Sequence, residues 1–104
     1  MLYIIYQEDG PDGAAARKRA RDSHFDYLDK HKDILVLGGA LLGDNNDERI
    51  GSVLIINVPD RAAAEAFSAN EPLRNAGAFK SVKISRMRRG QWNPDVAPKT
   101  AEGN

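Results

Sequence analysis

The stretch Gly51-Ser52-Val53-Leu54-Ile55-Ile56-Asn57-Val58 predicts a β-strand that is apolar on both faces. Side chains alternate along an extended chain, so Val53 and Ile55 point to one face while Leu54 and Ile56 point to the other. A strand from an antiparallel sheet with one wet face would instead alternate apolar with polar residues. The sheet that contains this strand therefore needs cover on both of its faces.

The segments around this strand predict a β-α-β-β-α-β order. Apolar runs at 2–6, 34–42 and 79–87 read as the other strands, and helix-forming runs at 13–32 and 61–68 read as helices. The order is typical of an α+β, ferredoxin-like fold with one four-stranded antiparallel sheet. Val82 and Ile84 alternate with polar neighbours, which favours an edge position for the last strand.

Right-handed crossovers place both helices on the same face of such a sheet, which leaves the other apolar face uncovered. Exposure of a large apolar side chain forgoes about 1.5–3 kcal/mol. We therefore expect a two-fold homodimer that pairs sheet against sheet, with Trp92 and the tail against the partner. The alternative is a monomer whose apolar sheet face binds another protein.

Composition limits the classes of function. The 104 residues suggest one domain at 1–90, followed by a small, polar and partly disordered tail at 91–104. The 15 basic and 15 acidic residues balance, which argues against a nucleic-acid partner. The chain has no cysteine and 2 histidines, so we expect no metal site and no cofactor. Without a basic leader or an apolar run of about 20 residues, we expect a cytoplasmic protein with no membrane contact.

The first predicted helix carries His24 on its apolar stripe, at helical spacing from Ala20 and Leu28. An imidazole exchanges protons near neutral pH, so this position suits acid–base chemistry. A core histidine bonded to backbone is the alternative, because histidine is intermediate in its burial preference. His31, near the end of the helix, is expected to interact with the helix dipole.

Glu71 is a second candidate because it precedes Pro72. The residue before a proline avoids helical geometry while proline suits the first helical position, so Glu71 should cap a short helical turn at 72–76. Glutamate is a poor cap compared with Ser, Asp, Asn or Thr, which favours a further contact for its carboxylate. Gly38 and Gly39 inside the second strand indicate a bulge or the close approach of another group to the backbone, so Gly39 is a candidate for substrate binding.

The chain resembles the YCII-related (YciI-like) family, and the likeness covers residues 1–87. Four features carry it, in this order: the start Leu2-Tyr3-Ile4-Ile5-Tyr6, the pair Arg21-x-x-His24, the glycines Gly38-Gly39, and the run Ala69-Asn70-Glu71-Pro72-Leu73-Arg74-Asn75-Ala76-Gly77. Members of the family have the dimeric α+β barrel fold, so the resemblance implies a homodimer of that type.

The resemblance also implies a site. The family's helix-one histidine and an aspartate before proline are proposed to lie at the edge of a cavity, and the matching residues here are His24 and Glu71. The glutamate departs from the family pattern because its arm is longer. Leu73 also departs from it, since the family has an aromatic residue at that position.

A histidine held by a carboxylate is suited to proton transfer. The carboxylate fixes the tautomer of the ring and makes its other nitrogen a better base. The sequence lacks a nucleophile elbow and a phosphate-binding glycine loop. We therefore expect cofactor-independent isomerisation, or an elimination such as loss of HCl from a chlorinated ring, which resembles an activity known in the family.

Two further side chains are candidates for the substrate site. Arg21 would hold an anionic substrate or an oxyanion, and Tyr6 would line the pocket. A solvated arginine and a packing tyrosine are the alternatives. For the whole chain, the alternatives are a non-catalytic module that binds a metabolite or a partner, and a cofactor-free oxygenase or haem-binding protein of the same fold.

Overall fold

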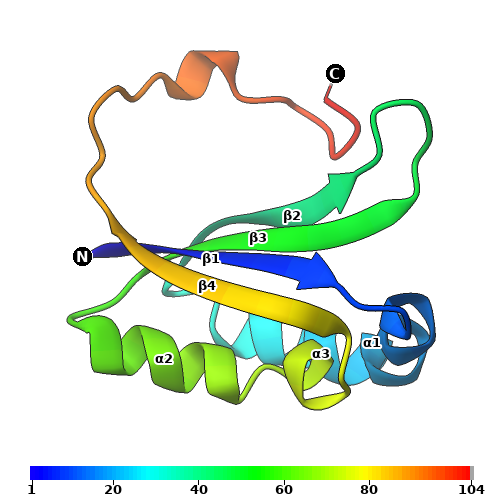
Figure 1. Ribbon diagram of the computed structural model, residues 1–104. Coiled ribbons are helices and arrows are strands. Elements are labelled where there is room, and N and C mark those ends of the chain that lie inside the picture. The colour runs from blue at the N-terminus through cyan, green and yellow to red at the C-terminus, as the bar shows by residue number, and fades with distance from the viewer. Residues whose placement is uncertain (104) are drawn as a thin grey trace.

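The computed structural model describes residues 1–103 of the chain. A four-stranded antiparallel sheet carries three helices on one of its faces (Figure 1). The elements follow in the order β1 (Leu2–Asp9), α1 (Gly13–Lys30), β2 (Leu35–Leu42), β3 (Arg49–Asn57), α2 (Arg61–Ala69), α3 (Pro72–Asn75), β4 (Phe79–Met87) and the 3-10 turn η1 (Pro94–Val96).

The predicted α+β, ferredoxin-like fold is confirmed. The strands lie in the order β2-β3-β1-β4, and each neighbouring pair is antiparallel. β4 is at the edge of the sheet, as its alternation of apolar and polar residues predicted. α1 ends at Lys30, two residues before the predicted end at Lys32. Beyond His31 the chain turns more tightly, since the N–H of Lys32 bonds to Asp29 and that of Ile34 to His31, each three residues back.

The core lies between the sheet and the helices. Ile5 of β1 pairs with Leu54 of β3 on one side and with Ile84 of β4 on the other, so all three point to the helices. Ile5 and Leu54 are buried, and Phe67 of α2 packs against them. We call this the inner face of the sheet.

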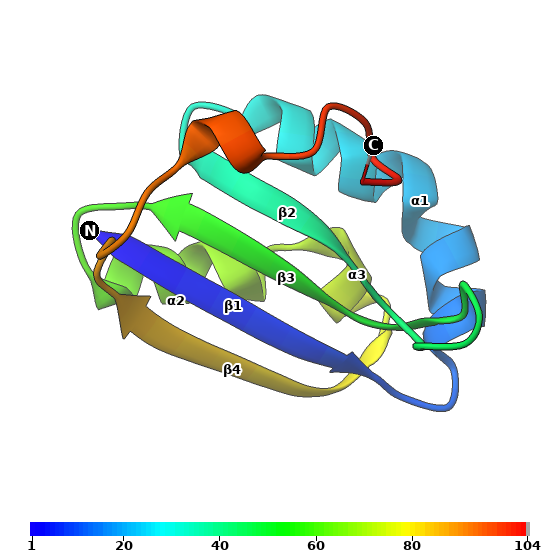
Figure 2. The same cartoon turned by 90° about the horizontal axis from the view of Figure 1, so that it is seen from above.

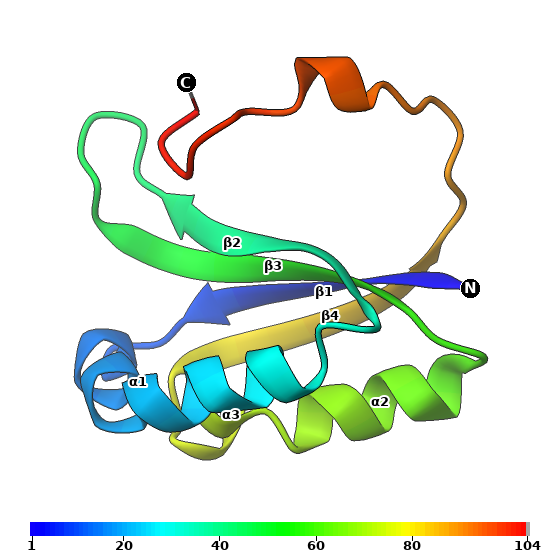
Figure 3. The same cartoon turned by 180° about the vertical axis from the view of Figure 1, so that it is seen from behind.

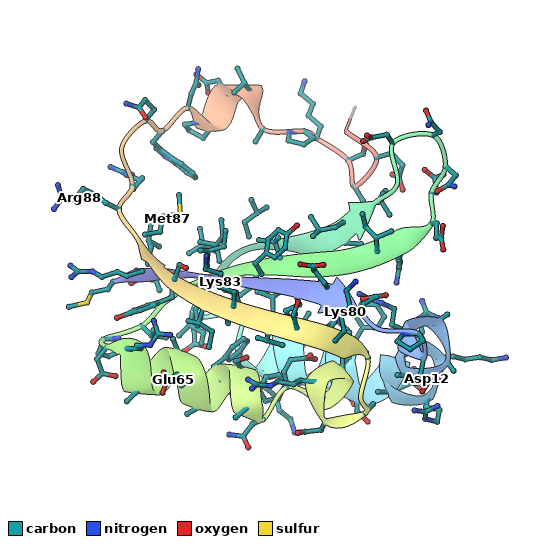
Figure 4. All side chains as sticks on the ribbon, viewed as in Figure 1. Asp12, Glu65, Lys80, Lys83, Met87 and Arg88 are labelled. Carbon is teal, nitrogen blue, oxygen red and sulfur yellow. The ribbon has the colours of Figure 1, made fainter. Side chains whose placement is uncertain are left out.

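The outer face carries the opposite set of side chains, as the alternation in the sequence predicted. Ile4, Val53 and Ile55 are half-buried there, while Leu37 is 65% exposed. The helices lie on the far side of the sheet, and the tail after β4 arches over the outer face (Figures 1 and 3). Met87 and Arg88 mark the point where β4 passes into this tail (Figure 4).

β2 is irregular near its start. Its register against β3 shifts between Leu35 and Leu37, so the bulge lies before the glycine pair, and Gly38 and Gly39 themselves are in regular register. A Cβ at Gly38 would lie 2.7 Å from Leu54 Cδ2, so a side chain there would displace the end of Leu54. A Cβ at Gly39 would meet nothing within 4 Å, so the close approach concerns Gly38 alone.

The tail returns from β4 along β2 toward α1 (Figure 2), and Asn104, the last residue of the predicted tail, lies outside the described residues. None of the helices within residues 1–103 combines the length and the apolar character needed to cross a bilayer.

Candidate functional site

His24 and Glu71 meet beneath the sheet although they come from distant parts of the chain. Nδ1 of His24 lies 2.5 Å from Oε1 of Glu71. The Glu71 side chain is 1% exposed and the His24 side chain is 18% exposed, so the bond is shielded from bulk water. An ionised carboxylate only accepts hydrogen bonds, so Nδ1 carries the proton and donates it to Glu71.

Local structure explains why this carboxylate is available. Glu71 is extended (φ −71°, ψ 126°) and precedes Pro72, which opens α3 at its first position. Oε2 of Glu71 accepts the backbone N–H of Arg74 at 3.3 Å, and this caps the helix. One oxygen therefore caps α3 and the other contacts His24, so Glu71 is both a helix cap and the partner of the histidine.

α1 presents His24 because small residues bring the helix close to α3. Ala16 and Ala20 are buried and pack with Leu73. A larger side chain at either alanine would hold the two helices apart. The close contact places the imidazole directly against the Glu71 carboxylate.

Tyr27 lies beside the pair and stays protonated. Its hydroxyl donates to the carbonyl oxygen of Phe67 at 2.8 Å. Burial raises the pKa of Tyr27 above its ordinary value of 10.0, and the negative charge of Glu71 raises it further. The tyrosine therefore serves as a fixed donor that joins α1 to α2.

A cavity of about 610 Å³ opens between α1 and the β2–β3 side of the sheet, with His24 in its wall. This volume suits a small organic ligand. Much of the lining is apolar, from Phe25, Leu28, Leu35, Leu54 and Leu73. Ala101 of the returning tail also lines the cavity.

The structure brings most of the predicted site residues together. Arg21 lies in the lining with His24, and its guanidinium stands 5.3 Å from the centre of the Phe25 ring. Gly39 also lines the cavity, through its backbone. Glu71 lies behind His24 rather than in the lining itself.

The prediction for Tyr6 is wrong. We predicted it in the pocket, but it lies on the outer face, where it lines a separate hollow of about 820 Å³ that does not include His24. The reason is the alternation of β1: Ile5 and Gln7 face the helices, so Tyr6 between them faces away.

Sequence reasoning missed four polar residues of the lining, one of them Arg17, which is paired with Asp9. Ser52 comes from the inner face of β3, and Lys18 and Arg49 add cationic groups. The alternation of β3 held a signal for Ser52, since it shares its face with Leu54 and breaks an otherwise apolar stripe. Lys18 and Arg49 resemble ordinary surface residues in the sequence, so only the tertiary structure places them at the cavity.

Comparison with known proteins identifies the family. A model of the YCII-related domain matches residues 1–88. The chain belongs to the YCII-related domain family. The resemblance predicted from the sequence is therefore confirmed. No curated protein matches the chain.

Solved structures of the same fold include one enzyme with a substantial likeness. The 5-chloro-2-hydroxyhydroquinone dehydrochlorinase of Burkholderia phenoliruptrix AC1100, solved in complex with 2,5-dihydroxybenzoquinone, is 29% identical with a TM-score of 0.80, over 86% of this chain and 96% of that chain. An antibiotic biosynthesis monooxygenase is 19% identical with a TM-score of 0.51, over 88% and 100% of the two chains. A protein of Agrobacterium tumefaciens is 18% identical with a TM-score of 0.52, over 90% and 98%. The last two show the fold alone.

Proposed function

We propose that this YciI-like protein is a cofactor-independent acid–base enzyme that eliminates HCl from a small ring compound, or isomerises one. The observation that carries the proposal is the His24–Glu71 bond at the wall of a cavity of ligand size. The likeness to a dehydrochlorinase at 29% identity supports the choice of reaction. The family and the fold by themselves do not select a substrate.

The two ring nitrogens of His24 have different roles. Nδ1 keeps its proton and its hydrogen bond to Glu71, and the carboxylate stabilises the imidazolium that forms when His24 accepts a second proton. Nε2 has no protein partner within the described part of the chain, so it is the nitrogen that takes the proton of the substrate. General acid–base catalysis of this kind contributes about 10²–10⁴-fold to the rate.

Elimination then needs no oxidant or reductant. In the keto tautomer of a chlorinated hydroxy-ring, Nε2 removes a proton and the electron pair of that bond moves into the ring. The carbon–chlorine bond breaks with its own electron pair, so a proton and chloride leave together. For isomerisation, His24 instead returns the proton to a different atom of the ring.

His24→Asn tests this role. An asparagine keeps an N–H donor for Glu71, so the buried carboxylate is not left unpaired, but it has no basic nitrogen. We expect the release of chloride from 5-chloro-2-hydroxyhydroquinone, followed without oxygen, to fall about 10²–10⁴-fold while Tm changes little. A variant with the rate of the wild type would contradict the proposal, and a wild type that binds the ring without turning it over would favour a binding module.

We also propose that the outer face of the sheet binds a second copy of the chain. The exposed Leu37 and the half-buried Val53 and Ile55 support this, because a lone chain would leave these apolar groups next to water. Sedimentation should give about twice the 11.4 kDa mass of one chain. Leu37→Lys should shift the protein to the single-chain mass, whereas Ala66→Lys on the exposed side of α2 should not. A monomeric wild type at micromolar concentration would refute the pairing.

A further inference from the structure

Ser52 has the only side-chain hydroxyl in the described lining of the cavity. It lies on the inner face of β3, and its register partners are Ala40 of β2 and Gln7 of β1. The residue is 9% exposed and belongs to the lining of the cavity. His24 reaches the same cavity from α1, so one wall of the cavity is helical and the other belongs to the sheet.

Gln7 determines whether the Ser52 hydroxyl accepts or donates a hydrogen bond between the two side chains. Its Nε2 donates to Ser52 Oγ at 2.8 Å, and the whole side chain is buried at 1% exposure. Its Oε1 is buried and accepts no hydrogen bond from residues 1–103.

The hydroxyl of Ser52 therefore still has a proton to give. A serine hydroxyl accepts and donates, and Gln7 uses only its accepting capacity. The Ser52 side chain donates to no other residue within the described part of the chain. A donor that is buried at a cavity wall and lacks an acceptor is suited to an oxygen of a bound ligand.

The charges around the cavity indicate that this oxygen is negative. The described lining has cationic side chains, from Arg17, Lys18, Arg21 and Arg49, and no Asp or Glu. Arg17 is neutralised by Asp9 at 2.8 Å, but the other three have no carboxylate partner in the described part of the chain. Such a field favours an anionic ligand and raises its local concentration.

We propose that Ser52 contacts the substrate and donates its hydroxyl proton to an anionic ring oxygen, while Gln7 is a positioning residue that keeps this proton directed to the ligand. The ligand class is a planar hydroxyquinone or phenolate anion. The proposal rests on the proposed function in using the same cavity and deepens it by naming the substrate class. It does not require that His24 transfer a proton.

Equilibrium titration with 2,5-dihydroxybenzoquinone tests the proposal, because this coloured vinylogous acid is an anion at neutral pH. Ser52→Ala should raise its Kd roughly tenfold to a hundredfold, the range for a hydrogen bond to a charged group. Gln7→Met keeps the length of the side chain but has no donor, and it should raise Kd by a smaller factor. In the Ser52→Ala background, Gln7→Met should have no further effect on Kd, since the hydroxyl that it positions is gone.

Ser52→Ala leaves the buried Nε2 of Gln7 without an acceptor, so it also lowers stability. The double variant Ser52→Ala/Gln7→Met removes both polar groups and should recover the lost Tm while Kd remains high. This separates loss of binding from loss of fold. The neutral 2,5-dimethoxybenzoquinone should bind more weakly than the anion to the wild type.

The outcomes are decisive in each arm. Failure of the wild type to bind the anion, or equal binding of the neutral ring, overturns the substrate class. An unchanged Kd in Ser52→Ala overturns the role of Ser52, and equal effects of Gln7→Met in both backgrounds overturn the positioning role of Gln7. The proposed function is judged separately, because His24→Asn should lose turnover and still bind the anion.

Discussion

His24 and His31 lie about two helical turns apart on α1 and its C-cap, yet they have different surroundings. His24 Nδ1 contacts a carboxylate from another part of the chain, and its ring lines a cavity. His31 Nδ1 lies 2.8 Å from the carbonyl oxygen of Tyr27 in its own helix. Its ring lies 4.2 Å from the Tyr27 ring and meets Phe67 edge-on at 5.3 Å.

The difference shows what converts a histidine into a candidate base. A backbone carbonyl fixes the tautomer of His31 but gives no charge that would stabilise an imidazolium, and aromatic neighbours fill the space around the ring. For His24, a buried carboxylate both fixes the tautomer and supplies the negative charge, and it leaves the other ring nitrogen unpartnered. The helix supplies both rings, and the tertiary partner decides the role of each.

Among the changes around these two histidines, the largest expected effect comes from changing the acceptor of His24. Glu71→Gln keeps the size of the side chain, and its carbonyl oxygen can still cap α3. Its NH2 group then faces His24 Nδ1, which reverses the tautomer of the ring, and the charge is gone, so turnover should fall roughly tenfold to a hundredfold. Stability should hold or rise, because a buried charge is no longer desolvated. Rates of chloride release and Tm measure both.

Glu71→Asp is the matched variant, since it keeps the charge on a shorter arm. It should lose less activity than Glu71→Gln, because the imidazolium still faces an anion. If the glutamine variant were the more active of the two, charge would not be what distinguishes His24 from His31.

His31→Ala should have the reverse profile. The loss of two ring contacts and one hydrogen bond should lower the free energy of unfolding by roughly 1–2 kcal/mol, while turnover below Tm stays at the wild-type level. Urea unfolding and initial rates measure the two quantities. A loss of turnover without a loss of stability would place His31 in the site and remove the contrast.

The smallest effect concerns Tyr27, which lies between the two histidines. Its pKa is raised in the folded chain above 10.0, so below that pH both states hold the proton and its contribution to stability is complete. Above that pH the unfolded chain releases the proton first, and the free energy of unfolding falls as pH rises toward the folded pKa. Tyr27→Phe should lack this fall.

Urea unfolding of the wild type and of Tyr27→Phe, from about pH 8 to pH 11, measures the difference. Other tyrosines and the lysines titrate in both proteins, so they cancel in the comparison. Curves that stay parallel across this range would show that burial and Glu71 do not act on Tyr27.

The sequence determined the fold and the two ends of the pair. The alternation of side chains along 51–58 divides its residues between two apolar faces, and it does so locally, because an extended chain has no other choice. Pro72 fixes Glu71 at a helix start, and the spacing on α1 puts His24 on the inner stripe. These features follow from backbone geometry over a few residues.

Only the tertiary structure decided which groups meet. Tyr6 was misplaced because the sequence does not state which face of β1 the helices cover, and the pairing puts Tyr6 opposite Val53 on the outer face. The bond between Ser52 and Gln7 is seen only in the folded chain, and so is the position of Lys18 and Arg49 at the cavity. Hydrogen bonds and charges act over a few ångströms, and the sequence does not state which distant residues will lie within that range.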